Sequence, residues 1–222
     1  MTWSLRDLAR RLDHAVLKPT ATDADLVAAA SMCVSRGVGC LCVRSSDVAA
    51  AAGLLAGSEV VLACVVGFPH GSFSGKVKAA EARLAIDQGA RELDMVMQVG
   101  AFLSGRVADV RADIAAVVAV AKPQGVLVKV ILETCFLTLG QVAAACRLAE
   151  EAGADMVKTS TGFGSGGATP QAVRVMLETV GGRLGVKASG GIRTWDDCVG
   201  YLDMGCARIG VGAAGDILDQ AP

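Results

Sequence analysis

Short apolar runs of strand length alternate along the chain with alanine-rich segments of helical periodicity, and the alternation continues from one end to the other. This pattern is typical of repeated βα units. The predicted strands span 12–17, 39–43, 60–65, 92–97, 126–132, 156–160, 185–189 and 208–211. The predicted helices between them span 23–36, 47–55, 76–88, 107–121, 139–152, 170–179 and 194–202.

Helix boundary signals support these predictions. Asp23, Thr169 and Thr194 are of residue types that cap helix N-termini, and Pro170 stands at a first helical position. Glycines fall where helices are expected to end. They are Gly37, Gly89, Gly153 and Gly205.

Eight strands alternating with helices within 222 residues predict a (β/α)8 TIM barrel that fills residues 1–222 as a single domain. No shift in composition and no Pro/Gly/Ser-rich linker divides the chain. A doubly wound open sheet is the alternative. The glycine-rich dinucleotide fingerprint that such a sheet carries after its first strand is missing.

Composition narrows the class of partner. Hydrophobic residues make up 53% of the chain and aromatic residues 4%, so the core is expected to consist of Ala, Val and Leu. The 21 basic and 22 acidic residues nearly cancel, and no run of like charge suggests nucleic acid. A small-molecule partner is favoured. With neither a secretory signal nor an apolar run of roughly 20 residues, we expect a cytoplasmic protein that does not cross a membrane.

The eight cysteines are scattered and include no Cys-x-x-Cys pair, which indicates free thiols rather than disulfides or a metal site. Cys40 and Cys42 are two apart on a predicted strand and therefore share a face, where they could in principle hold a metal. The chain has only two histidines, and neither lies beside this pair in the sequence. We predict no metal.

Charged residues interrupt four of the predicted apolar strands: Asp94, Lys129, Lys158 and Lys187. Because side chains alternate along a strand, their apolar neighbours face the helices and these four point into the barrel. The lysines are 29 residues apart at each step (158 − 129 and 187 − 158), about one βα unit. A buried, unpaired cation is costly, so Lys158 and Lys187 suggest an imine-forming amine tuned by a neighbouring ammonium.

A buried ion-pair cluster that merely fills the barrel is the structural alternative. Three lysines against one aspartate leave a cationic surplus, which an anionic ligand, a protonation shift or Glu133 would have to balance. This surplus suggests a phosphorylated substrate.

Three glycine-rich loops at the strand ends support that suggestion, because glycine lets backbone N–H groups approach a phosphate. Glycines that merely permit tight turns are the alternative for any one loop. The loops contain Gly162, Gly190, Gly191, Gly210 and Gly212.

Six motifs, in this order, resemble those of deoxyribose-phosphate aldolase over nearly the whole chain. They are LDHAVLKP (12–19), VVGFPHG (65–71), ELDMV (92–96), VKVILET (128–134), VKTSTGF (157–163) and VKASGGIR (186–193). The resemblance implies a class I aldolase that reversibly cleaves 2-deoxy-D-ribose 5-phosphate to glyceraldehyde 3-phosphate and acetaldehyde, without cofactor or metal. It implies that Lys158 forms the Schiff base, Lys187 lowers the proton affinity of that amine, and Asp94 shuttles protons. It also implies a homo-oligomer, a dimer or larger.

The implied substrate-binding residues are Thr161, the five loop glycines named above and Lys129, whose alternative role is ion pairing inside the barrel. Where the family has paired serines near the C-terminus, this chain has Gly212, Ala213 and Ala214. We therefore expect weaker discrimination between phosphorylated and free deoxyribose. Two other functions are considered: another Schiff-base aldolase or transaldolase, and a phosphosugar-binding barrel without turnover.

Overall fold

The computed structural model describes residues 3–222 and closes eight parallel strands into a barrel in sequence order. Each strand pairs with the next, and β1 pairs with β8, so the sheet has no free edge. This confirms the predicted (β/α)8 barrel and excludes the open sheet. The strands are β1 Leu12–Val16, β2 Cys40–Val43, β3 Val61–Val66, β4 Glu92–Val96, β5 Leu127–Ile131, β6 Met156–Lys158, β7 Gly185–Ser189 and β8 Arg208–Val211.

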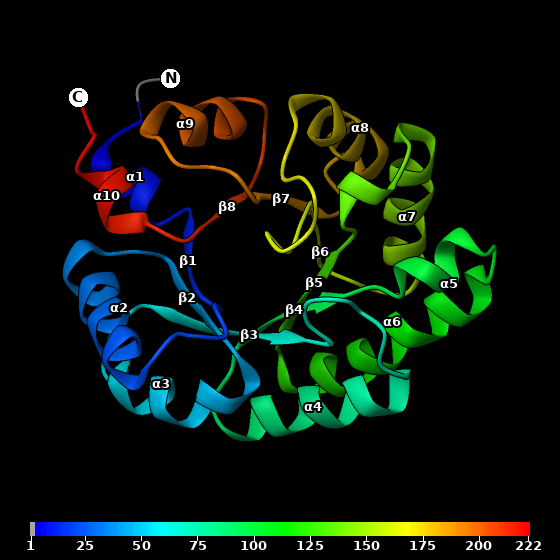
Figure 1. Cartoon of the computed structure of the whole chain (residues 1–222), viewed down its shortest axis with the longest axis horizontal. Helices are drawn as coiled ribbons and strands as arrows, with labels where there is room; N and C mark the ends of the chain where they lie inside the picture. Colours follow the sequence, from blue (N-terminus) through cyan, green and yellow to red (C-terminus); the bar gives the residue numbers. More distant parts are fainter. Residues whose placement is uncertain (1–2) are drawn as a thin grey trace.

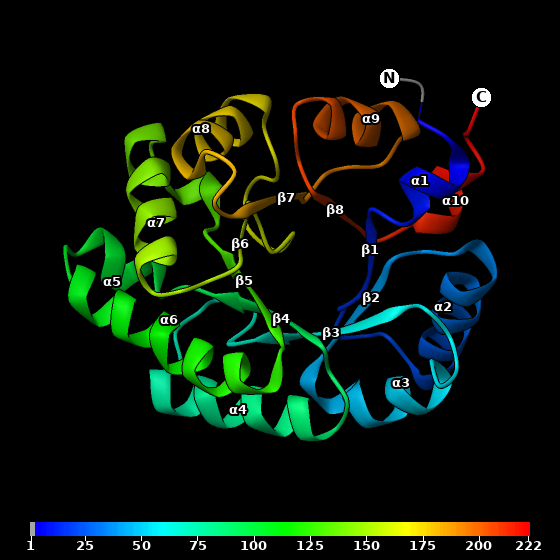
Figure 2. The same cartoon turned by 180° about the vertical axis from the view of Figure 1, so that it is seen from behind.

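Helices surround the ring of strands, as Figures 1 and 2 show from opposite sides. All seven predicted helices are present, and two of them, α2 and α6, have the predicted bounds. The seven are α2 Asp23–Arg36, α3 Val48–Leu54, α4 Gly75–Asp87, α6 Val107–Ala121, α7 Leu139–Glu151, α8 Pro170–Val180 and α9 Trp195–Asp203. None of the helices in residues 3–222 combines the length and the hydrophobicity required to cross a bilayer.

The structure adds short helical segments that the periodicity did not predict. Each covers one turn or little more, too little chain to show a repeating apolar face. They are α1 Leu5–Ala9, α5 Val99–Leu103, α10 Ala214–Leu218 and the 3₁₀ turns η1 Ser45–Asp47, η2 Lys122–Gln124 and η3 Thr134–Phe136.

The N-cap predictions are confirmed at two positions and wrong at one. Thr169 and Thr194 cap α8 and α9 through their hydroxyls. At α2 the cap is Thr22 rather than Asp23, because the Thr22 hydroxyl accepts from the Asp25 N–H while the Asp25 carboxylate accepts from Thr22. This reciprocal arrangement satisfies two backbone donors that a cap at Asp23 would leave open.

The barrel interior has an apolar side and a charged side. Strands β2 and β3 contribute small apolar side chains to the interior, where Cys40, Cys42, Ala63 and Val65 pack together with Leu17. Strands β4 to β7 contribute charged side chains instead. All eight cysteines are free thiols, as predicted.

Candidate active site

The structure brings the four predicted interior residues together. Asp94 and Lys129 are register partners on β4 and β5, and Lys158 and Lys187 are register partners on β6 and β7. Register partners on parallel strands point to the same face of the sheet, and here that face is the interior. Each residue is at most 4% exposed.

Asp94 lies at the centre of this group and contacts all three lysines. Its Oδ1 accepts from Lys129 Nζ at 2.7 Å, and its Oδ2 accepts from Lys158 Nζ at 2.8 Å and from Lys187 Nζ at 2.7 Å. Burial alone would raise the pKa of the Asp94 carboxyl. The three ammonium groups outweigh burial and hold this pKa well below its ordinary value.

Three further charged residues complete the group, and the sequence analysis did not predict them. Asp13 accepts from Lys187 and lies 3.2 Å from Lys129 Nζ. Glu92 Oε2 lies 2.5 Å from Lys129 Nζ. Arg208 donates from Nε to Asp13 at 2.7 Å and from Nη1 to Glu92 at 3.1 Å.

We call the complete set the lysine cluster. It consists of Asp13, Glu92, Asp94, Lys129, Lys158, Lys187 and Arg208.

A periodic signal for the three missed residues is present in the sequence. Glu92 stands two residues before Asp94 on the same strand, and Arg208 stands two residues before Gly210 on β8. On β1, Leu12 precedes Asp13 and points outward into the core between strands and helices, so Asp13 points the other way, into the barrel. The period of two, applied to every charged strand residue, predicts that all three face inward.

The expected cationic surplus is present but smaller than the four predicted residues implied. The lysine cluster holds four cationic groups and three carboxylates, a formal charge of 4 − 3 = +1 instead of the expected 3 − 1 = +2. Glu133 does not supply the balance that we considered, because its carboxylate accepts from Thr161. When one lysine is an uncharged amine, the lysine cluster is neutral.

Lys158 is the lysine best placed to be that amine. Burial lowers the pKa of Lys158, the nearby Lys187 ammonium lowers it further, and Asp94 compensates only in part. Lys187 contacts both Asp13 and Asp94, which outweigh its burial and raise its pKa above the ordinary value. Lys129 contacts three carboxylates, and its pKa is also raised despite burial. The three lysines therefore differ in the number of carboxylates that hold their charge.

The lysine cluster runs along the barrel from one end to the other. Arg208 and Glu92 are the first residues of their strands, whereas Lys158 is the last residue of β6. Lys158 therefore lies at the carboxyl end of the strands, where active sites of this fold are built.

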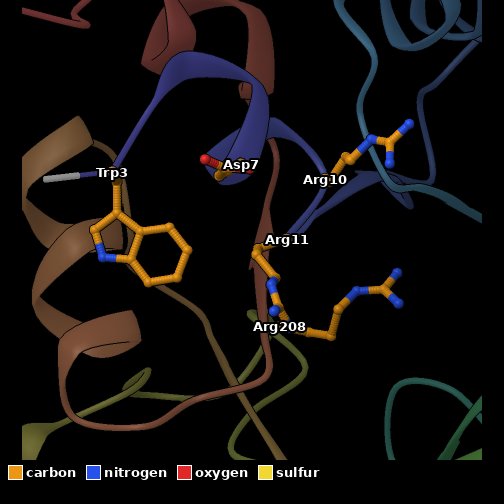
Figure 3. Close-up of a pocket in the computed structure, with 5 residues that line it drawn as sticks. All are labelled: Trp3, Asp7, Arg10, Arg11 and Arg208. Atoms are coloured by element: carbon orange, nitrogen blue, oxygen red, sulfur yellow. The ribbon is translucent and has the colours of Figure 1, made fainter. Parts of the chain in front are cut away.

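A cavity of about 420 Å³ lies at the opposite end, beside Arg208. Its lining comes from the segment before β1, from α1 and from the start of β8, as Figure 3 shows. The lining residues are Trp3, Asp7, Arg10, Arg11 and Arg208. This cavity is on the amino-terminal side of the strands and thus across the barrel from Lys158.

Thr161, predicted to bind substrate, is held by Glu133 in the structure. The Thr161 hydroxyl donates to the Glu133 carboxylate, and the Thr161 N–H donates to the same group at 3.2 Å. The Thr161 hydroxyl also accepts from the Phe163 N–H at 3.0 Å. Its hydrogen bonds are therefore already made within the protein, and Glu133 accepts from both its hydroxyl and its N–H.

The predicted loop glycines fall into two groups. Gly190 and Gly191 have φ angles of 88° and 80°, in the left-handed region that favours glycine. Gly210 lies within β8 rather than in a loop, and a Cβ there would come 2.7 Å from Ser189 Cβ and 3.1 Å from Lys187 Cε. Gly210 thus makes room for Ser189 and Lys187, and its place within a strand differs from the predicted place in a loop.

The end of β8 offers fewer free backbone donors than expected. Gly212 is exposed, and Gly162 in the loop after β6 is exposed as well. The N–H of Ala214, at the start of α10, donates to His14 Nδ1 at 3.3 Å. A phosphate at this end would therefore depend on the N–H groups around Ala214 rather than on that of Ala214 itself.

One group of side chains has metal-ligand types at short range: Asp13, Cys40 and Glu92 offer ligand atoms within 4.8 Å of one another. The two carboxylates already face Lys129 and Arg208. A divalent cation there would meet two positive charges, so the residues present fit ion pairing better than metal binding.

Comparison with known proteins finds relatives among the aldolases. The model of the DeoC/LacD family aldolases matches residues 8–215. The chain is 49% identical over 227 residues to a deoxyribose-phosphate aldolase of Mycobacterium avium, covering 99% of both.

Solved structures agree with this match. A putative deoxyribose-phosphate aldolase from Coccidioides immitis has a TM-score of 0.95 and 38% identity, covering 99% of this chain and 87% of that chain. The tetrameric deoxyribose phosphate aldolase from Aeropyrum pernix has a TM-score of 0.91 and 34% identity, covering 97% of this chain and 91% of that chain.

Proposed function

The chain belongs to the DeoC/LacD family of aldolases, and from this premise we propose that it cleaves 2-deoxy-D-ribose 5-phosphate through a Schiff base on Lys158. The products are glyceraldehyde 3-phosphate and acetaldehyde, and the reaction is reversible. The observation that carries the proposal is the charge balance of the lysine cluster, which becomes neutral when Lys158 is a free amine.

The reaction starts with the attack of Lys158 Nζ on the C1 aldehyde of the open-chain sugar. Proton transfer gives a carbinolamine, and loss of water gives the iminium. A base takes the proton of the 3-hydroxyl, the C2–C3 bond breaks, and its electron pair moves into the iminium. This step releases glyceraldehyde 3-phosphate and leaves an enamine. Protonation at C2 and addition of water then release acetaldehyde and restore the amine.

Asp94 is suited to move protons in these steps because its Oδ2 contacts both Lys158 and Lys187. Lys187 keeps its charge through Asp13 and Asp94 and so disfavours protonation of Lys158. Lys129, enclosed by three carboxylates, is assigned to ion pairing rather than to substrate contact.

We assign the phosphate to the turn at Gly190 and Gly191 together with Gly162 and Gly212 at neighbouring strand ends. Thr161 acts here through the shape of its loop, since its hydroxyl is engaged by Glu133. We further propose a single-domain cytoplasmic enzyme of deoxyribose catabolism that works as a homo-oligomer. The tetrameric relative from Aeropyrum pernix supports the assembly.

Incubation with acetaldehyde and borohydride, followed by peptide mapping, tests the proposal. We expect a reduced adduct on Lys158 that Lys158→Met abolishes, with a fall in kcat/KM for deoxyribose 5-phosphate of at least about 10⁴-fold. Lys76→Met, at an exposed lysine of α4, is the matched control. It should keep both the adduct on Lys158 and the wild-type kcat/KM.

Two other results would redirect the assignment. An adduct on Lys158 without cleavage of deoxyribose 5-phosphate would favour another Schiff-base aldolase. Absence of any adduct on Lys158 would contradict the proposal and favour a barrel that only binds phosphosugars.

A further inference from the structure

The Lys158 amine is covered in this structure, although an aldehyde has to reach it. The Lys158 side chain is 5% exposed at the carboxyl end of β6. A carbonyl carbon must approach Nζ to within bonding distance, and the sugar phosphate carries four further carbons and a phosphate behind that carbon. A segment over the carboxyl end of the barrel therefore has to move.

The loop from β6 to α8 is the segment that covers this end. Figure 1 shows it reaching inward over the centre of the ring of strands, and Figure 2 shows the same from behind. At one end it is fixed by the hydrogen bonds from Thr161 to Glu133. At the other end, the Ala168 N–H lies 3.0 Å from the carbonyl oxygens of Ser189 and Gly190.

Between these anchors few hydrogen bonds hold the loop. Residues 162–167 are four glycines, one serine and Phe163. Within residues 3–222, their backbone N–H groups make a single hydrogen bond, from Phe163 to the Thr161 hydroxyl, and it stays inside the loop. Phe163 is the one large side chain available to hold this stretch in place.

Phe163 contacts a second loop, the one after β3. Its ring meets that of Phe68 edge to face, with centroids 5.3 Å apart and an interplanar angle of 86°. Phe68 in turn packs on the apolar interior side chains of β2 and β3. Strands β3 and β6 are three positions apart around the barrel, so the two rings bridge its mouth.

We propose that Phe163 and Phe68 form an aromatic latch that holds the β6–α8 loop over the barrel mouth and makes access to Lys158 depend on the size of the aldehyde. A two-carbon aldehyde passes the closed latch, whereas a larger one requires the rings to part. The inference rests on the proposed role of Lys158 as the imine-forming residue. Phe163 is 47% exposed, so its removal leaves the core intact.

Reductive trapping at Lys158 with two aldehydes tests the latch. The measured quantity is the ratio of the trapping rate with 3-phenylpropanal to the rate with acetaldehyde. An edge-to-face pair of this kind is worth enough to shift an open-to-closed ratio about 2- to 10-fold. We expect Phe163→Ala and Phe68→Ala each to raise the rate ratio by that factor, and the double variant to raise it no further.

Phe73→Ala is the matched control, because Phe73 lies in the same loop as Phe68 and is 50% exposed. It should leave the ratio unchanged. An unchanged ratio in Phe163→Ala and Phe68→Ala, or effects that multiply in the double variant, would overturn the latch.

Amide hydrogen exchange of Thr161, Phe163 and Ala168, whose N–H groups are hydrogen-bonded, separates this inference from the proposed function, since it needs no chemistry at Lys158. Faster exchange in Phe68→Ala supports the latch even if no aldehyde is trapped, a result that would refute only the Schiff base. Unchanged exchange in a protein that does trap acetaldehyde at Lys158 would overturn the latch and leave the Schiff base standing.

Discussion

Lys158 and Lys187 occupy register-paired positions on β6 and β7 and share one acceptor, the Oδ2 oxygen of Asp94. Two ammonium groups this close repel each other inside a buried site. Asp13 stabilises the charge of Lys187 and not that of Lys158, so the repulsion is relieved by loss of the Lys158 proton.

Replacement of Lys187 by Met should move the pH dependence of imine formation to higher pH. Burial and the Lys187 charge both lower the pKa of Lys158, so the free amine appears below the ordinary pH range of lysine. Without the Lys187 charge, Lys158 keeps its proton to higher pH. The rate of acetaldehyde trapping measured against pH checks this, with Lys76→Gln as the surface control. An ascending limb that stays in place or moves to lower pH would contradict the assigned role of Lys187.

Asp13→Asn should destabilise the protein by about 3 kcal/mol at neutral pH, because it leaves Lys187 and Arg208 short of a buried counter-charge. Urea unfolding measures this cost. Asp109→Asn, at an exposed ion pair on α6, is the control and should change stability little.

The cost at Asp13 should also depend on pH in a defined direction. The cationic neighbours of Asp13 outweigh its burial and lower its pKa in the folded state. The stabilisation that the Asp13 carboxylate gives to the fold is therefore complete at any pH above its pKa in the unfolded chain. That contribution is lost as pH falls below about 4, toward the folded pKa. The stability gap between wild type and Asp13→Asn should therefore narrow in acid, and a gap that widens there would rule out this explanation.

Glu133→Ala should be less stable than Glu133→Gly by about 1 kcal/mol. Glu133 has a φ of 54°, and this left-handed conformation is costly for any residue with a Cβ. Both variants lose the hydrogen bonds to Thr161, and only glycine relieves the backbone cost. The comparison is made by urea unfolding.

Ser104 provides the control for this pair of variants. It is exposed and has a φ of −83°, where alanine is the better residue. The order of stability should therefore reverse, with Ser104→Ala above Ser104→Gly. The same order at both positions would show that the conformation of Glu133 carries no cost.

Ala213→Ser should strengthen the preference for the phosphorylated sugar. Ala213 is exposed directly after Gly212, where a hydroxyl would add a hydrogen bond to a phosphate, and the next N–H, from Ala214, is taken by His14. One hydrogen bond to a charged phosphate corresponds to a change of about tenfold in the preference for the phosphorylated sugar. The ratio of kcat/KM for deoxyribose 5-phosphate to that for deoxyribose measures it, and an unchanged ratio would count against a phosphate at this end.

The barrel and the inward position of four charged residues followed from local patterns. Strand-length apolar runs, helical segments and glycine stops are properties of short stretches, and the alternation of side chains places Asp94, Lys129, Lys158 and Lys187 on the inner face without knowledge of the partners. The same rule would have placed Asp13 and Glu92. The predicted cationic surplus was too large because these two carboxylates were left out together with Arg208.

The sequence by itself determined the alternation of strands and helices and the family to which the motifs belong, because both depend on short segments of the chain. Only the tertiary structure decided which carboxylate holds which lysine, and Asp13 and Lys187 are 174 residues apart in the chain. It also decided that Gly210 faces Lys187 and that Phe163 meets Phe68. Ion pairs and ring contacts act over a few ångströms, and the closure and register of the barrel set those distances.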